Sequence, residues 1–158
     1  MAIHRVTKIL PWTPQQLAAL VADVCAYPDF VPWVTSMRVW NVREEAPGVS
    51  LLDAEAGVGF AMLKERFSTW VRYDANRCVV EVGLIRGPFK HLKNRWEFHS
   101  DPAGSRVEFM IDFAFKSRIL DAMLHANFDR AVDRLMSCFE AEARRRYPSP
   151  DGRGLEAR

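Results

Sequence analysis

The fold is decided by the stretch VEFMIDFAF at residues 107–115. Its odd-numbered positions are all large and apolar, whereas its even-numbered positions include Glu108 and Asp112. The preceding stretch, LKNRWEFH at residues 92–99, alternates in the same way, with Trp96 and Phe98 on its apolar face. Alternation with a period of two is typical of antiparallel strands that have one wet face. The aromatic face of such a sheet must be covered by another element.

Turn signals divide the chain into strand-length runs about ten residues apart, with no helical pattern between them. They are Ala46-Pro47-Gly48, Gly57-Val58-Gly59, Asp74-Ala75-Asn76, Gly87-Pro88 and Asp101-Pro102-Ala103-Gly104. Residues 2–10 add a first strand that Pro11 ends. The spacing predicts a curved antiparallel sheet of six or seven strands in an α+β fold.

One helix is predicted after the first strand and another after the last strand. Thr13, Pro14 and Gln16 form a helix start with a capping box, and Pro28 is expected to end that helix. Residues 117–147 predict one helix roughly 45 Å long, which would cover the aromatic face. The apolar stripe of this last helix is Leu120, Leu124, Phe128, Ala131, Leu135 and Phe139.

Two patches combine large apolar side chains with prolines or glycines, YPDFVPW at residues 27–33 and GPFKHL at residues 87–92. Both are predicted to be irregular surface connections, because such backbones do not continue a helix or a central strand. Apolar side chains on loops are costly to expose unless they line a mouth or contact a partner or membrane. The patches therefore indicate a hydrophobic binding site and not a polar reaction centre.

Composition predicts a globular protein of 158 residues, 49% hydrophobic, with a formal net charge of only +2. One domain is expected over residues 1–147, followed by a flexible tail at 148–158. Nothing approaches the ~20 apolar residues of a membrane span, and no secretory leader is visible. A cytoplasmic protein is expected, at most peripheral on the inner face of the membrane, with its three cysteines as reduced thiols.

The order of elements resembles the START-like helix-grip superfold. The patches Tyr27-Pro28-x-Phe30-x-Pro32-Trp33 and Gly87-Pro88-Phe89-Lys90-x-Leu92-x-x-x-Trp96 resemble its coenzyme Q-binding and polyketide cyclase-like branch. That branch includes mitochondrial quinone chaperones and the bacterial ribosome-association toxin. The resemblance implies a tunnel between sheet and last helix that holds a polyprenyl quinone (ubiquinone) or a related lipid. The mouth would be Tyr27, Phe30, Trp33, Phe89 and Leu92, and the lining Trp96, Phe109, Phe113, Phe128 and Leu135.

Two of these assignments have a plainer alternative. The aromatic rings of the sheet would equally fill a closed core and contact only one another. The segment at residues 86–93 would place Phe89 in a bilayer with Arg86, Lys90 and Lys93 at anionic head groups. The alternative is a β-turn in which Phe89 folds back onto the core and the charges are solvated.

Catalysis has little support in the sequence, so no enzyme activity and no cofactor are expected. The four histidines lack metal-ligand spacing, and Gly57-Val58-Gly59 lacks the third glycine of a dinucleotide loop. Glu65 and Arg66 lie in an apolar strand, where one is expected to face inward or both to pair at the sheet edge. Three functions follow: quinone binding, block of ribosomal subunit joining, and cyclisation of an aromatic polyketide. The expected partners are a lipid, a membrane surface or the ribosome, and not DNA.

Overall fold

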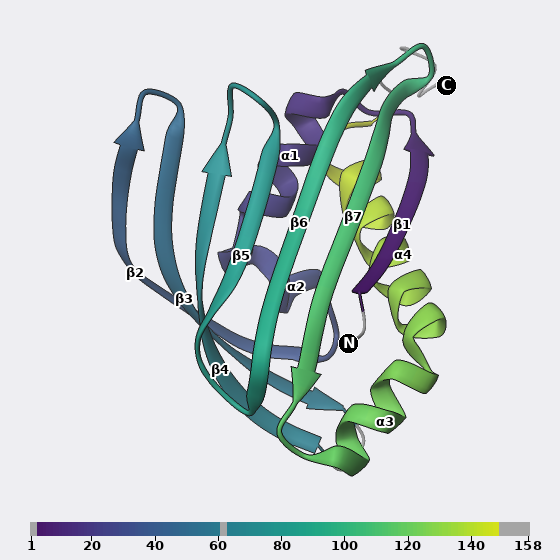
Figure 1. Ribbon diagram of the computed structural model, residues 1–158. Coiled ribbons are helices and arrows are strands. Elements are labelled where there is room, and N and C mark those ends of the chain that lie inside the picture. The colour runs from purple at the N-terminus through teal and green to yellow at the C-terminus, as the bar shows by residue number, and fades with distance from the viewer. Residues whose placement is uncertain (1–2, 61–62, 149–158) are drawn as a thin grey trace.

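The computed structural model describes residues 3–60 and 63–148, which form an antiparallel sheet wrapped around helices on one face (Figure 1). Its seven strands are β1 (Ile3–Leu10), β2 (Val34–Ala46), β3 (Val49–Phe60), β4 (Leu63–Asp74), β5 (Val79–Arg86), β6 (Phe89–Asp101) and β7 (Gly104–Phe115). Their order in the sheet is β1-β7-β6-β5-β4-β3-β2. This is the predicted meander, with β1 added beside β7. The α+β helix-grip architecture is confirmed.

Four of the five predicted turns connect strands. The exception is Gly57-Val58-Gly59, which lies inside β3 and pairs with β4, so its prediction as a hairpin turn is wrong. Gly57 packs where an added Cβ would come within 2.4 Å of the Ser36 hydroxyl, so the glycine permits close approach of β2 and β3. A glycine in a strand can therefore mark tight strand packing as well as a turn.

The first helical segment is interrupted before Pro28. Helix α1 (Pro14–Ala22) starts with the predicted capping box, in which Thr13 and Gln16 bond each other's backbone N–H. A short 3-10 turn, η1 (Val24–Ala26), then leads into α2 (Tyr27–Phe30). Pro28 lies in the first turn of α2, where a missing N–H costs nothing, so it helps to start a helix and does not end one.

The single long C-terminal helix predicted from residue 117 to 147 is two helices, α3 (Arg118–Ala126) and α4 (Phe128–Arg146). The break lies at Asn127, whose φ and ψ are −109° and 17°. Its side-chain amide donates to the Met123 carbonyl at 2.7 Å and so competes with the helical backbone bonds. In Figure 1 the two helices meet at an angle, and α3 lies beyond the end of β7.

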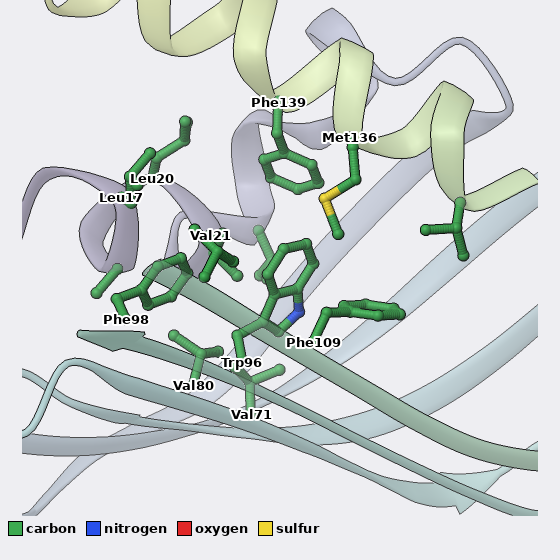
Figure 2. Packing of buried hydrophobic residues seen from close by; sticks show 14 of the residues in the cluster. Leu17, Leu20, Val21, Val71, Val80, Trp96, Phe98, Phe109, Met136 and Phe139 are labelled. Atoms are coloured by element: carbon green, nitrogen blue, oxygen red, sulfur yellow. The ribbon is translucent and has the colours of Figure 1, made fainter. Parts of the chain in front are cut away.

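The core lies between the sheet and helices α1 and α4. Figure 2 shows Trp96 of β6 between Met136 and Phe139 of α4 and the valines of the sheet. The Trp96 ring lies 5.3 Å from the Phe139 ring and 4.7 Å from the Phe109 ring. The buried stripe of α4 is Phe128, Val132, Met136, Phe139, Glu142 and Ala143. Of the predicted stripe, Phe128 and Phe139 are buried, and Leu120, Leu124 and Leu135 are partly buried against the core. Ala131 is exposed.

The end of α4 is tied to the segment that follows β1. The Trp12 indole donates to the Tyr147 carbonyl at 2.9 Å, and Ser105 donates to the Trp12 carbonyl. The domain predicted for residues 1–147 stays a prediction, of which the structure describes residues 3–60 and 63–147. The tail predicted for 148–158 lies outside the described residues except for Pro148, which is exposed.

Candidate functional site

A pocket of about 390 Å³ lies between the sheet and the junction of α3 with α4. It is lined by Trp33, Val58, Phe67, Phe89, Phe115, Met123, Leu124, Asn127, Arg130, Ala131 and Arg134. The volume is within the usual range of small-molecule sites, at its lower end. The break at Asn127 contributes to the pocket, because α3 and α4 approach it from different directions.

The floor of the pocket is aromatic. The Phe89 ring stacks on Phe115 at 4.4 Å and meets Phe67 edge-on at 5.2 Å. Phe89 and Phe115 are each only 8% exposed. Gly87 lies directly beside Phe67, since a Cβ there would come within 2.5 Å of that side chain. The backbone of the β5–β6 turn can therefore pass close enough for Phe89 to reach the inside of the sheet.

The rim of the pocket is basic. Arg130 and Arg134 lie one turn apart on α4, and the Arg134 guanidinium lies 5.4 Å from the Trp33 ring centre. Within the described residues neither arginine has a carboxylate within ion-pair distance. With Asn127, these side chains offer several hydrogen-bond donors beside an apolar space. The pocket can thus hold an apolar molecule whose polar end accepts hydrogen bonds.

Two of the five predicted mouth residues line this pocket, Trp33 and Phe89. Tyr27 instead packs edge-on against Phe139 at 5.3 Å, and its hydroxyl donates to the Val21 carbonyl at 2.5 Å. Burial raises the pKa of the Tyr27 phenol, and the negative charge of Asp23 adds to this. Phe30 contacts the same ring of Phe139, and Leu92 packs against the core. These three residues belong to the core and do not form the mouth of this pocket.

None of the five predicted lining residues reaches the pocket. Trp96 and Phe109 are 5% and 4% exposed and fill the core beneath α4. Phe113 lies 6.2 Å from Phe128, and Leu135 is partly buried against the core. The predicted tunnel lined by these five residues therefore stays a prediction, and the pocket between the sheet and the α3–α4 junction has other lining residues. The alternative, in which these rings contact one another, describes them correctly because α1 and α4 close that half of the sheet.

The predicted membrane contact is divided between two faces. Arg86, Lys90 and Lys93 are exposed, as their charges require. Phe89 points inward, which is the β-turn alternative, so its assignment to a bilayer contact is wrong. The segment is also less irregular than predicted, because β6 begins at Phe89 itself.

Glu65 and Arg66, the two adjacent charged residues of β4, do not pair with each other. Glu65 is half-buried, and it pairs in register with Val58, a pocket residue. Arg66 points to the other face and is exposed. No ion pair joins Glu65 to Arg66 where the structure describes them, so the predicted edge pair is wrong. Glu65 lies on the pocket side of the sheet and does not itself line the pocket.

The outer face of the sheet carries a second group of polar residues. Oxygen and nitrogen atoms of Glu97, His99 and Glu108 lie within 4.8 Å of one another, a spacing that a metal ion could bridge. Both carboxylates are already bonded, to Arg95 at 2.6 Å and to Arg106 at 3.0 Å. The hydrogen bond from Arg95 lowers the pKa of Glu97 despite partial burial, and His99 contributes further. These arginines neutralise the cluster, which therefore behaves as a surface ion-pair network.

Several pocket residues were missed by sequence reasoning. Val58 was assigned to a turn, and Phe67 was one apolar residue in a strand without clear alternation. Arg130 and Arg134 lie on the polar side of α4 in the helical pattern, where a solvated face is the ordinary interpretation. The i, i+4 spacing of two arginines was the available signal, but only the tertiary structure places it beside Trp33.

A family model described as polyketide cyclase / dehydrase and lipid transport matches residues 10–140. Among curated relatives, the ribosome association toxin RatA of Rickettsia prowazekii is 30% identical over 141 residues, 87% of this chain and 93% of that protein. The mitochondrial coenzyme Q-binding protein COQ10 homolog B of Xenopus laevis is 30% identical over 145 residues, 89% of this chain and 57% of that protein.

A solved structure, that of an 18 kDa protein from Caulobacter crescentus, is also similar. It is 55% identical, superposes with a TM-score of 0.79, and the match covers 92% of this chain and 97% of that protein. Within the described residues, none of the helices is both long and apolar enough to span a bilayer.

Proposed function

This chain belongs to the polyketide cyclase / dehydrase and lipid transport family, and we propose that it binds a polyprenyl quinone or a closely related lipid. The observation that carries the proposal is the pocket of about 390 Å³ between the sheet and the α3–α4 junction. Apolar side chains supply its floor, and its polar groups are confined to the rim. The name of the Xenopus relative supports a quinone as the ligand.

The pocket suits a quinone in both its parts. Flat aromatic rings such as Phe89 and Phe115 offer large apolar contact area, and Met123 adapts to a flexible chain. The quinone carbonyls would accept hydrogen bonds from Arg130, Arg134 or Asn127 at the rim. A long tail would extend past this small pocket and require the α3 side to open.

We propose that the protein binds its lipid and does not transform it. The polar members of the pocket lining are two arginines and one asparagine. General acid–base catalysis usually needs a group that titrates near neutral pH, such as a histidine or a carboxyl of raised pKa. Cyclisation of a polyketide would have to use Glu65, the half-buried carboxylate on the pocket side of β4. Turnover that is lost in Glu65→Gln would replace the binding proposal with an enzymatic one.

The test is extraction of the protein purified from its own host, followed by mass spectrometry of the extract. We expect a quinone in near-stoichiometric amount. Ala131→Trp should fill the pocket from its exposed rim and remove the quinone, since Ala131 lines the site. Ala141→Trp is the matched control, because Ala141 is exposed on the same helix away from the pocket. A wild-type protein that is empty and takes up no quinone from vesicles would refute the proposal.

A second candidate function is ribosome association, favoured by the similarity to RatA over 93% of that protein. A protein that contacts RNA through basic residues loses affinity steeply as salt rises. Co-sedimentation with ribosomal subunits that weakens between low and moderate salt would support this function. If Ala131→Trp removes the lipid and leaves co-sedimentation unchanged, the two functions use different parts of the molecule.

A further inference from the structure

Helix α3 exposes an apolar stripe. Ile119 is 84% exposed and Met123 is 45% exposed, while Ala122 and Ala126 are exposed beside them. These four residues lie at spacings of three, four and seven, which places them on one side of the helix. The other side of α3 carries Leu124, which lines the pocket. Helix α3 therefore has apolar residues on two sides, and nothing in the described chain covers the side that carries Ile119.

The polar residues of α3 hold it in this orientation. The Asp121 carboxylate accepts a hydrogen bond from the Phe115 backbone at 2.9 Å and lies 3.2 Å from the His125 ring nitrogen. His125 in turn lies 2.9 Å from His4 of β1. Because these groups face the sheet, the acid of this helix is turned away from the apolar stripe. The stripe therefore faces solvent as a consequence of specific contacts.

Basic residues flank the stripe. Lys116 and Arg118 are exposed at the start of α3, and the Lys116 N–H donates to the Pro88 carbonyl at 2.9 Å. This bond places the β5–β6 turn, with exposed Arg86 and Lys90, beside the start of α3. Figure 1 shows α3 at the same end of the sheet as this turn.

The apolar stripe of α3 adjoins the rim of the pocket. Met123 belongs to both surfaces, and exposed Arg130 and Arg134 follow it on α4. The exposed carboxylates of this region are Asp129 and Asp133. Asp129 raises the pKa of His4 of β1 through its charge, so this carboxylate acts on the β1 side as well as on the rim.

We propose that α3 docks the protein on an anionic lipid bilayer, with Ile119 and Met123 among the acyl chains and the basic residues at the head groups. An interfacial helix of this kind combines an apolar side with flanking Lys and Arg. RNA is bound through basic residues and stacked aromatic rings, whereas this stripe is aliphatic. The inference rests on the proposed function and extends it, because docking places the pocket mouth at its source of lipid.

The experiment is vesicle flotation of the full chain with phosphatidylcholine alone and with an equimolar phosphatidylglycerol mixture. We expect binding to the mixed vesicles, weakened by salt, and little binding to the neutral ones. Ile119→Glu should reduce binding at least about tenfold, because it replaces an aliphatic side chain that would be buried among the acyl chains with a charged one. Val42→Glu is the matched control, because Val42 is 67% exposed on the edge strand β2. Unchanged melting temperatures would show that both variants fold.

Equal vesicle binding by wild type and Ile119→Glu overturns the proposal. Absence of wild-type binding to the anionic vesicles overturns it as well. Loss of ribosome co-sedimentation in Ile119→Glu, without vesicle binding by the wild type, overturns it in favour of a ribosomal contact. Retention of a short-chain ubiquinone supplied in detergent is measured on the same proteins. A protein that docks but never retains quinone refutes the proposed function alone. One that retains quinone but does not dock refutes the inference alone.

Discussion

Replacement of Glu142 by glutamine should lower the stability of the protein in a pH-dependent way. Glu142 is 7% exposed near the end of α4 and accepts hydrogen bonds from Arg145 at 2.6 Å and Arg146 at 2.8 Å. Arg146 also pairs with Asp23 at 3.2 Å and so ties α4 to the segment after α1. The Arg146 side chain is 21% exposed, so it is a link between two elements and not a freely solvated residue at the end of α4.

The magnitude follows from the pKa of the carboxyl. Hydrogen bonds from Arg145, opposed by burial and supported by Arg146, lower the pKa of Glu142 from 4.5 to about 2. A depression of that size corresponds to about 3 kcal/mol of stability at neutral pH. Arg145 is 71% exposed, and solvent screening reduces its share, so about 2 kcal/mol is expected.

The sign follows from linkage. A carboxyl whose pKa is lower in the folded state stabilises the protein above its unfolded pKa of 4.5, and this contribution is lost as the pH falls through about 2. Glu142→Gln should thus cost about 2 kcal/mol at pH 7 and about half as much at pH 3. At neutral pH this is a drop of about 4–8 °C in Tm for a chain of this size.

The assay is urea unfolding of wild type and variant between pH 3 and pH 7, followed by tryptophan fluorescence. Trp12 is a local reporter, because its indole donates to the carbonyl of Tyr147, next to Arg146. Glu140→Gln is the matched control: its partner Lys8 is 40% exposed, so the change should be below about 1 kcal/mol. A difference between wild type and Glu142→Gln that stays constant over this pH range would refute the reasoning.

Three further outcomes are expected. Burial and the neighbouring His125 lower the pKa of His4, against a weaker opposing effect of Asp129. Protonation of His4 therefore favours the unfolded chain, so stability should fall as the pH drops below about 6.5. In thermal melts His4→Gln should flatten this fall, and an unchanged pH dependence would contradict the assignment. Phe89→Ala should destabilise the protein by about 3–5 kcal/mol, because its ring is buried in the pocket floor; a loss below 1 kcal/mol in urea unfolding would show that the floor is loosely packed. Trp33→Ala should weaken quinone retention with little change in Tm, since Trp33 is half-buried at the rim of the pocket. Normal retention would show that Trp33 is not part of the binding site.

Local patterns in the sequence were sufficient for most of the fold. Alternation at residues 92–99 and 107–115 identified β6, β7 and their buried face, because side chains on a strand point to opposite sides with a period of two. The capping box at Thr13 located the start of α1 because its bonds span only three residues. Errors came where one local signal has two meanings. Pro28 can end a helix or occupy its first turn, and Gly57 can make a turn or allow close strand packing.

The sequence by itself determined which side chains are apolar, on which face of each strand they lie, and that something must cover the aromatic face. Only the tertiary structure decided which of those side chains face a cavity. Trp96 and Phe89 are both aromatic and both point to the inner face of β6. Helices α4 and α1 close over Trp96, whereas the break at Asn127 leaves space beside Phe89. A cavity depends on how far apart the covering elements lie, and that distance is set by contacts between residues remote in the sequence.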